Sequence, residues 1–187
     1  RAHKLKQQLT LQEEELLHKI KKETHIDVQL MAARSVAKVF DKLGLPYERT
    51  AKSQAPSFTK NFISNHSHPV VRMIAQAREV NKAHTTFIDT IIKHEHKGRI
   101  HADINQIRSD YGGTVTGRFS YSNPNLQQLP ARNKDLGPMI RSIFIPEEGH
   151  TWGCFDYSQQ EPRLVVHYAA LHKFPSVNDV IDNYEND

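Results

Sequence analysis

The chain has 187 residues, 37% of them hydrophobic and 25% charged, with a formal net charge of +4 at pH 7. This length and composition predict one large or two small folded domains, and they exclude a chain that is disordered throughout. A single cysteine excludes an internal disulfide framework and suggests a reducing compartment, and no apolar run reaches the roughly 18 residues of a membrane-spanning helix.

The first half of the chain has helical patterning. Apolar residues recur at helical spacing, and Gly44 followed by Pro46 marks the C-terminal end of the second helix. No glycine occurs between Leu45 and Lys97, which fits a helical region. The expected elements are helices at 1–24, 27–43, 58–65 and 69–92, with a loop at 50–57.

After Gly98 the pattern changes from helical to extended. Glycine and proline recur between residues 112 and 130, which predicts a long non-helical stretch. Trp152 and Cys154 lie in an apolar run, where we expect both side chains to be buried. The remaining expected elements are strands at 99–107, 140–145 and 151–157, a turn at 146–149 and a helix at 158–171.

Charge changes sign at the same place. Residues 1–100 hold 18 basic and 10 acidic side chains, whereas residues 101–187 hold 7 basic and 11 acidic ones. One interpretation is a surface that binds a polyanion next to a site that binds a cation. The other is ordinary variation of surface charge, and the counts alone leave both open.

A carboxylate stands between an expected strand and an expected helix. Asp156 ends the apolar run, and Ser158 with Glu161 has the spacing of a helix capping box, with Pro162 in the first turn. Such a position can hold a carboxylate rigidly and leave it open to a divalent cation. In the alternative interpretation Asp156 is a turn residue and Glu161 only a cap.

Several segments resemble motifs of family A DNA polymerases. D-Y-S-Q-Q-E-P-R at 156–163 is similar to the first palm motif of that family, whose usual form is D-Y-S-Q-[IV]-E-L-R. T-G-R-F-S at 116–120 and P-N-L-Q-Q-L-P-A-R at 124–132 resemble the family's T-G-R-L-S and P-N-L-Q-N-I-P-x-R. Further similar segments lie at 140–146, like I-R-x-x-F-x-P, and at 42–46 and 78–89, like the thumb.

This resemblance covers residues 27–175 and implies an α+β fold. Residues 1–97 would form a helical thumb, and residues 98–187 part of the antiparallel-sheet palm of a right-hand polymerase. The implied activity is template-directed addition of deoxynucleotides to a primer 3′-hydroxyl by two-metal phosphoryl transfer with Mg2+. The implied partners are primer–template DNA and deoxynucleoside triphosphates, in the cytoplasm of a bacterial cell and encoded there or by a phage. It implies no membrane partner and identifies no processivity factor.

The resemblance also implies roles for residues of the palm motif. Asp156 would bind the catalytic Mg2+ ions together with the main-chain carbonyl of Tyr157. Glu161 would lie under the sugar and reject a 2′-hydroxyl, and Ser158 and Gln159 would line the nucleotide site. We expect the neighbouring Arg163 to tie this helix to the sheet.

A second implied set of residues contacts DNA. Arg118 would reach the primer-terminal base pair from the minor groove, where every correct pair offers acceptors. Arg78 and Lys82 lie four residues apart on one helix face, which suits them to successive phosphates or, alternatively, to a solvated surface. The other implied contacts are Asn125, Gln127, Gln128 and Arg132.

The lack of an initial methionine and the abrupt end predict a piece of a longer protein. We expect the fingers helix and the second metal-binding carboxylate of the family beyond Asp187, so that the isolated chain is inactive. One alternative is a non-catalytic primer–template-binding module derived from a polymerase. Another is a histidine metal site at His66–His68 or His94–His96, but these pairs lack cysteine partners, and we expect surface histidines.

Overall fold

A computed structural model describes residues 1–110, 112–131 and 133–185. Within these residues the chain is rich in helix and has three two-stranded antiparallel sheets, which confirms the α+β class. The chain forms two compact units, 1–144 and 145–187, and each is described by itself. This division does not coincide with the boundary expected at residue 98, because Ile140 is fully buried in the helical core of the first unit.

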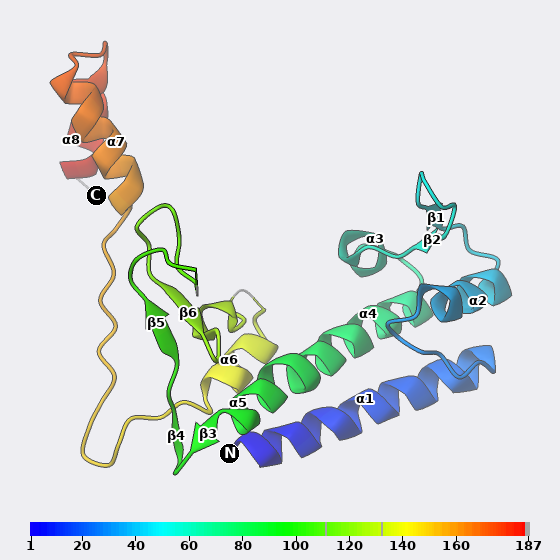
Figure 1. The fold of residues 1–187 in the computed structure, drawn as a ribbon. Helices are drawn as coiled ribbons and strands as arrows, with labels where there is room; N and C mark the ends of the chain where they lie inside the picture. The colour runs from blue at the N-terminus through cyan, green and yellow to red at the C-terminus, as the bar shows by residue number, and fades with distance from the viewer. Residues whose placement is uncertain (111, 132, 186–187) are drawn as a thin grey trace. The chain divides into compact units, whose positions relative to one another are not determined.

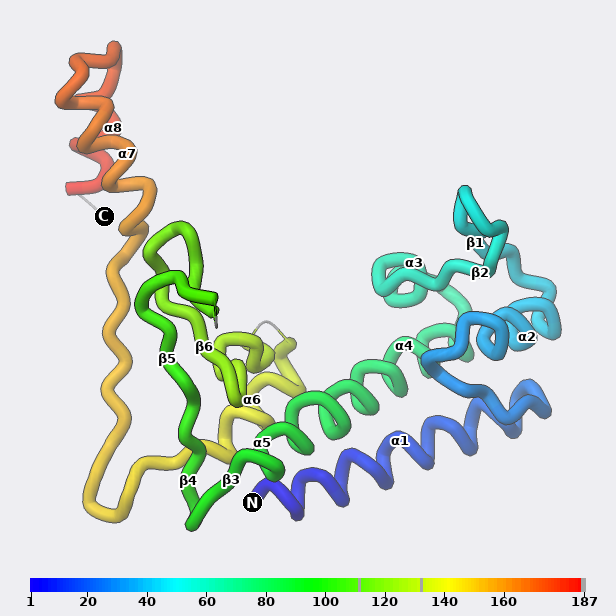
Figure 2. The backbone as a smooth tube through the Cα atoms, in the orientation of Figure 1, coloured from blue at the N-terminus to red at the C-terminus, as the bar shows by residue number. Residues whose placement is uncertain are grey.

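Two long helices form the centre of the first unit. α1 (Ala2–Thr24) and α4 (Pro69–Lys82) run side by side in opposite directions (Figures 1 and 2). The predicted helical spacing places Leu9, Ile20 and Ile74 at their interface, where each is fully buried. α4 continues through the π-helical segment η1 (Ala83–Ile88) into α5 (Asp89–Lys93). The helices expected at 1–24 and 69–92 are thus confirmed, the second with a π-helical interruption.

α2 (Ala33–Leu43) ends as its sequence predicts. Gly44 adopts a left-handed conformation with φ 65°, and the amide of Leu45 donates to the carbonyl of Phe40 at 2.9 Å. The helix begins at Ala33 rather than near residue 27, because α1 runs to Thr24 and the chain needs the intervening residues to reverse direction.

An aromatic cluster covers the far end of the helix pair. Phe40 is fully buried, with ring centroids of Phe58 and Phe62 at 4.8 and 5.9 Å. β1 (Glu48–Arg49) pairs with β2 (Pro56–Ser57), so the expected loop is the tip of a small hairpin. α3 (Lys60–Ser64) follows, slightly shorter than expected, and Thr59 caps it by accepting from the amide of Phe62.

Short hairpins replace the long strand expected at 99–107. β3 (Glu95–His96) pairs with β4 (Arg99–Ile100), and β5 (Asp103–Asn105) pairs with β6 (Ser120–Ser122), with Ile104 opposite Tyr121. A single turn of 3-10 helix, η2 (Leu126–Gln128), follows β6. The stretch from 112 to 130 is otherwise non-helical, as the glycines and prolines predict.

Two predicted strands are wrong. Residues Leu136–Arg141 form α6, and no described residue from 145 to 157 belongs to a strand. An apolar run forms a strand only where a neighbouring strand accepts its backbone hydrogen bonds, and the second unit offers none among its described residues. Trp152 is accordingly 71% exposed and Cys154 is also exposed, contrary to our expectation of burial.

The second unit contains α7 (Gln160–Leu171) and α8 (Val177–Glu185), and no described residue of either helix is buried. Arg163 joins them: Nε donates to the carbonyl of Ser158 at 3.0 Å, and a terminal nitrogen donates to the carbonyl of Tyr184 at 3.1 Å. The structural role expected for Arg163 is therefore present, but its partner is a helix and not a sheet. No described helix of the chain is long and apolar enough to cross a membrane.

Replacing Phe40 with alanine tests the aromatic cluster. Removing this fully buried ring should lower the free energy of unfolding by about 3–5 kcal/mol, since the lost burial and the remaining cavity both destabilise. Leu11→Ala on α1, where the side chain is 61% exposed, is the control and should change it by less than about 0.5 kcal/mol. Urea denaturation measures both, and equal effects would contradict the assigned core.

Candidate nucleic-acid interface

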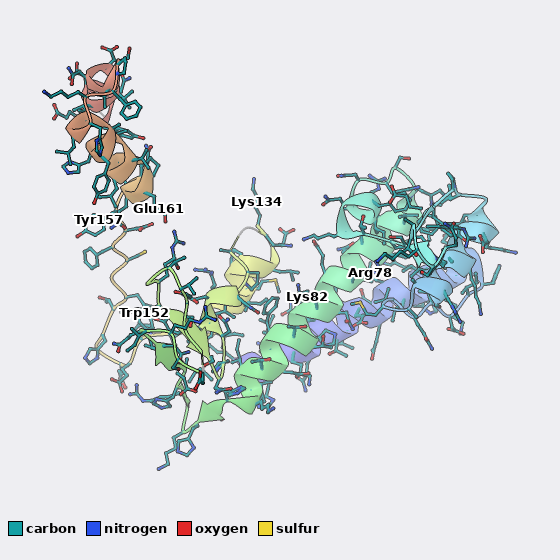
Figure 3. All side chains as sticks on the ribbon, turned by 45° about the horizontal axis from the view of Figure 1, so that its top comes forward. Arg78, Lys82, Lys134, Trp152, Tyr157 and Glu161 are labelled. Carbon is teal, nitrogen blue, oxygen red and sulfur yellow. The ribbon has the colours of Figure 1, made fainter. Side chains whose placement is uncertain are left out.

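A groove of about 520 Å³ runs along α3, α4 and η1 in the first unit. Arg78 and Lys82 both line it, so the spacing of four residues does place them on one face of α4 (Figure 3). The side chains that complete its polar lining are those of Lys60, Ser64, Glu79, Asn81, Thr85 and Thr86. The groove therefore combines three cationic side chains and one carboxylate with three hydroxyls and one amide, and its cations, hydroxyls and amide are of the kinds that bind phosphate oxygens.

Arg78 is partly committed to the fold. Its Nε donates to the carbonyl of Leu30 at 2.7 Å, and a terminal nitrogen donates to the carbonyl of Phe58 at 3.1 Å. Burial lowers the pKa of the Arg78 guanidinium, which still carries its charge at neutral pH. One side chain thus holds the connector before α2 and the segment before α3 against α4, a structural function that the sequence did not indicate.

The other cations of the groove are more exposed. Lys60 Nζ lies 3.4 Å from a carboxylate oxygen of Glu79, in an ion pair between an exposed lysine and a half-exposed glutamate side chain. Such pairs contribute little to stability, so Lys60 remains able to exchange Glu79 for another anion. Lys82 Nζ lies 5.9 Å from the centre of the Phe87 ring, in a cation–π contact one and a half turns further along the helix.

The segment with the implied DNA contacts Asn125, Gln127 and Gln128 forms a braced loop. Asn125 Oδ1 accepts from the amide of Gln127 at 3.1 Å, and Gln127 Nε2 donates to the carbonyl of Phe119 at 3.0 Å. The main-chain carbonyl of Arg118 accepts from the Thr114 hydroxyl at 2.7 Å. Gln128 is exposed, and Arg132, the last residue expected to contact DNA, lies outside the described residues.

A smaller cavity of about 140 Å³ joins this loop to the helix. Asn125 and Gln128 line it from one side, and Thr86 and Phe87 of η1 from the other. Thr86 also lines the larger groove. Two sets of residues that are far apart in sequence therefore meet at Thr86. Sequence reasoning missed this residue as a site member, although its spacing from Lys82 places it on the same helix face.

The carboxylates of the palm motif lie in the second unit. Asp156 and Glu161 are exposed, as is Tyr157 at 80% (Figure 3 labels Tyr157 and Glu161). The predicted capping box is wrong: α7 begins at Gln160, and its N-cap is Gln159, with φ 51° and no side-chain capping bond. The left-handed Gln159 separates Ser158 from the helix, so the Ser158 hydroxyl is not at the capping position.

These residues fit a magnesium ion in part. The Asp156 carboxylate and the Tyr157 carbonyl are adjacent hard oxygen donors, and Mg2+ takes only one or two carboxylates where water and substrate phosphates complete its shell. No group of three or more His, Cys, Asp or Glu side chains within the described residues could hold a metal ion. Among the histidines, His68 instead caps α4 by accepting from the amide of Val70 at 3.2 Å.

Comparison with known proteins identifies the family. The model of DNA polymerase family A matches residues 1–180. The chain belongs to DNA polymerase family A. A relative named DNA-directed DNA polymerase, from Pseudomonas phage M6, is 37% identical over 166 residues. The thermostable DNA polymerase I of Thermus aquaticus is 40% identical over 138 residues.

The family A chain also resembles a solved structure, the POL domain of Pol1 from M. smegmatis in complex with DNA primer-template and dNTP. The TM-score is 0.64 at 23% identity, which supports the fold, and the match covers 80% of this chain and 26% of that one. The matches to the phage and Thermus polymerases cover 81% and 71% of this chain but only 25% and 16% of those proteins. The family A chain therefore spans a quarter or less of these relatives.

Replacing Arg78 with methionine tests its structural function. The stem is kept, but the carbonyls of Leu30 and Phe58 lose their donor, so the free energy of unfolding should fall by about 1–3 kcal/mol. Arg72→Met on the same helix is the matched control, because Arg72 is exposed and its loss should cost less than about 0.5 kcal/mol. If chemical denaturation gives both variants the same midpoint, Arg78 does not hold these segments.

Proposed function

We propose that this chain is the thumb and the first part of the palm of a DNA-directed DNA polymerase, and that its groove holds the backbone of primer–template DNA. The observation that carries the proposal is the cationic lining of the groove in a chain of family A, since Arg78 and Lys82 share one face with the hydroxyls of Thr85 and Thr86. Phosphate contacts of this kind fix the position of a duplex without reading its sequence. The relatives come from bacteria and phages, so the proposed place of action is the bacterial cytoplasm.

Within the groove, Lys82 is the proposed main contact to a phosphate. Its ammonium group forms no ion pair among the described residues, whereas the Arg78 guanidinium already donates to two carbonyls. Arg118 would contact the primer-terminal base pair from the minor groove. The braced loop with Asn125 and Gln127 would lie along the template strand, together with Gln128 and Arg132. The support for this loop is its cavity shared with Thr86, which joins it to the groove.

In the palm motif, Asp156 and the carbonyl of Tyr157 are the proposed ligands of Mg2+, the divalent ion that the resemblance to family A polymerases implies. The ion would supply charge stabilisation for attack of the primer 3′-oxygen on the α-phosphate. Glu161, one residue into α7, would lie under the sugar and exclude a 2′-hydroxyl, and Ser158 and Gln159 would line the nucleotide site. The exposure of this whole segment supports a site that is open to substrate.

Lys82→Ala tests the phosphate contact. Removing one cation from the groove should reduce the slope of log affinity against log salt by about 0.9, whatever the DNA sequence. Fluorescence anisotropy of a labelled primer–template over a series of KCl concentrations measures the slope. Lys38→Ala on α2 is the control, because Lys38 is exposed and does not line the groove. An unchanged slope in Lys82→Ala would remove this residue from the interface.

Primer extension tests the expectation that the isolated chain is inactive. With Mg2+, primer–template and all four deoxynucleotides, the 187-residue chain should incorporate nothing, because a two-metal site needs more carboxylates than Asp156 alone. A denaturing gel of a labelled primer resolves single additions. Extension by even one nucleotide that disappears in Asp156→Asn would show that the chain holds a working site.

A further inference from the structure

A buried polar cluster lies between α1 and the helix formed by α4 and η1, which lines the groove. His84 Nε2 lies 2.5 Å from Glu13 Oε2, and Asn81 Nδ2 donates to both carboxylate oxygens of Glu13, at 3.0 and 3.2 Å. The side chains of Glu13 and His84 are only 13% and 10% exposed. Polar groups at this depth are costly unless they are paired, so the three side chains depend on one another.

The cluster lies where α4 changes its winding. The π-helical segment η1 begins at Ala83, directly after Asn81 and Lys82. A π-helical turn holds an extra residue, so the residues after it are rotated about the axis relative to their positions in a continuous α-helix. Ala83, His84 and Ile88 are buried, while Asn81, Lys82, Thr85 and Thr86 line the groove. The winding at this point decides which side chains meet the groove.

Each contact of the cluster restrains that winding. The main-chain carbonyl of Asn81 accepts from the Thr85 hydroxyl at 2.7 Å, so Asn81 is bound to Glu13 through its side chain and to a residue of the groove through its backbone. His84 Nδ1 is buried without a hydrogen-bond partner among the described residues. The Glu13 carboxylate is thus the polar partner of the imidazole, and its loss would take this partner from both His84 Nε2 and Asn81 Nδ2.

We infer that Glu13 is a positioning residue for the DNA interface: it lies outside the groove and, through Asn81 and His84, fixes the orientation in which Lys82, Thr85 and Thr86 face the DNA backbone. The inference rests on the proposed function for its ligand. The geometry that carries it, one carboxylate bound to two residues on either side of the start of a π-helical segment, is independent of DNA.

The sign of the effect separates positioning from simple electrostatics. Removing a negative charge from a protein that binds a polyanion should strengthen binding or leave it unchanged. Loss of positioning should weaken it. Glu13→Gln and Glu14→Gln remove the same charge at neighbouring positions of α1, and Glu14 is exposed, so the second variant is a matched control.

The experiment measures anisotropy of a labelled primer–template duplex with the 187-residue chain and its variants. Glu13→Gln should bind about three- to tenfold more weakly than the wild type, a loss of the size expected for one ordinary hydrogen bond. Glu14→Gln should bind as tightly as the wild type or more tightly. Equal affinities of Glu13→Gln and Glu14→Gln would overturn the inference.

A double variant excludes a merely structural role. If Glu13 acts in part through Lys82, the loss of affinity in Glu13→Gln with Lys82→Ala should be smaller than the product of the two single losses, whereas independent effects would multiply. Fully multiplicative losses would overturn the inference. Glu13→Asp, which keeps the charge on a shorter side chain, should recover part of the affinity.

Amide hydrogen exchange tests the same inference without DNA. Exchange at residues 83–88 should accelerate in Glu13→Gln and not in Glu14→Gln, because local opening of η1 costs less once its anchor is lost. Unchanged exchange in both variants would contradict the inference. A wild-type chain that does not bind DNA at all would contradict the proposed function. The exchange result would then still test whether Glu13 holds η1 in place.

Discussion

Packing of α1 against α4 is the interaction on which the rest of the first unit depends. Leu9, Ile20 and Ile74 are fully buried there, and each buried aliphatic side chain contributes about 1.5–3 kcal/mol. α4 has 14 residues, a length at which an isolated helix is only marginally stable in water, so it depends on such a partner. The pair also forms a continuous base on which the aromatic cluster, the hairpins and α6 are arranged.

The same packing places opposite chemistry on the two faces of α4. Toward α1 the helix carries apolar side chains together with Asn81 and His84, which bind Glu13, whereas Lys82, Thr85 and Thr86 line the groove, which Asn81 also reaches. The π-helical segment η1 contributes to both, because His84 binds Glu13 of α1 while Thr85 and Thr86 line the groove. The arrangement explains how a basic surface can be rigid: its cations extend from a helix whose rear face is fixed.

Local signals in the sequence predicted much of this fold. Helical periodicity and the Gly44–Pro46 punctuation gave α1, α2 and the run from α4 to α5, because each helix buries one stripe of side chains. The strands expected at 140–145 and 151–157 were wrong, since a strand depends on distant partners that no local pattern contains. The burial expected for Trp152 and Cys154 failed for the same reason.

The members of the candidate site were easier to predict from the sequence than its geometry. The spacing of Arg78 and Lys82 correctly placed them on one face, but the commitment of Arg78 to Leu30 and Phe58 arises from contacts across 48 and 20 residues of sequence. The pairing of Glu13 with His84 spans 71 residues and has no local signal. The motif at 156–163 indicated the family, and the family match over residues 1–180 confirms that identification.

The groove along α3, α4 and η1 is the proposed place where this chain meets DNA. Titration of the 15N-labelled chain with unlabelled primer–template, followed by amide chemical shifts, tests this central claim most directly. The largest shift changes should fall on residues 78–86 and 118–128, around the groove and the cavity that shares Thr86. Changes centred on α2 or α8, with none along α4, would contradict it.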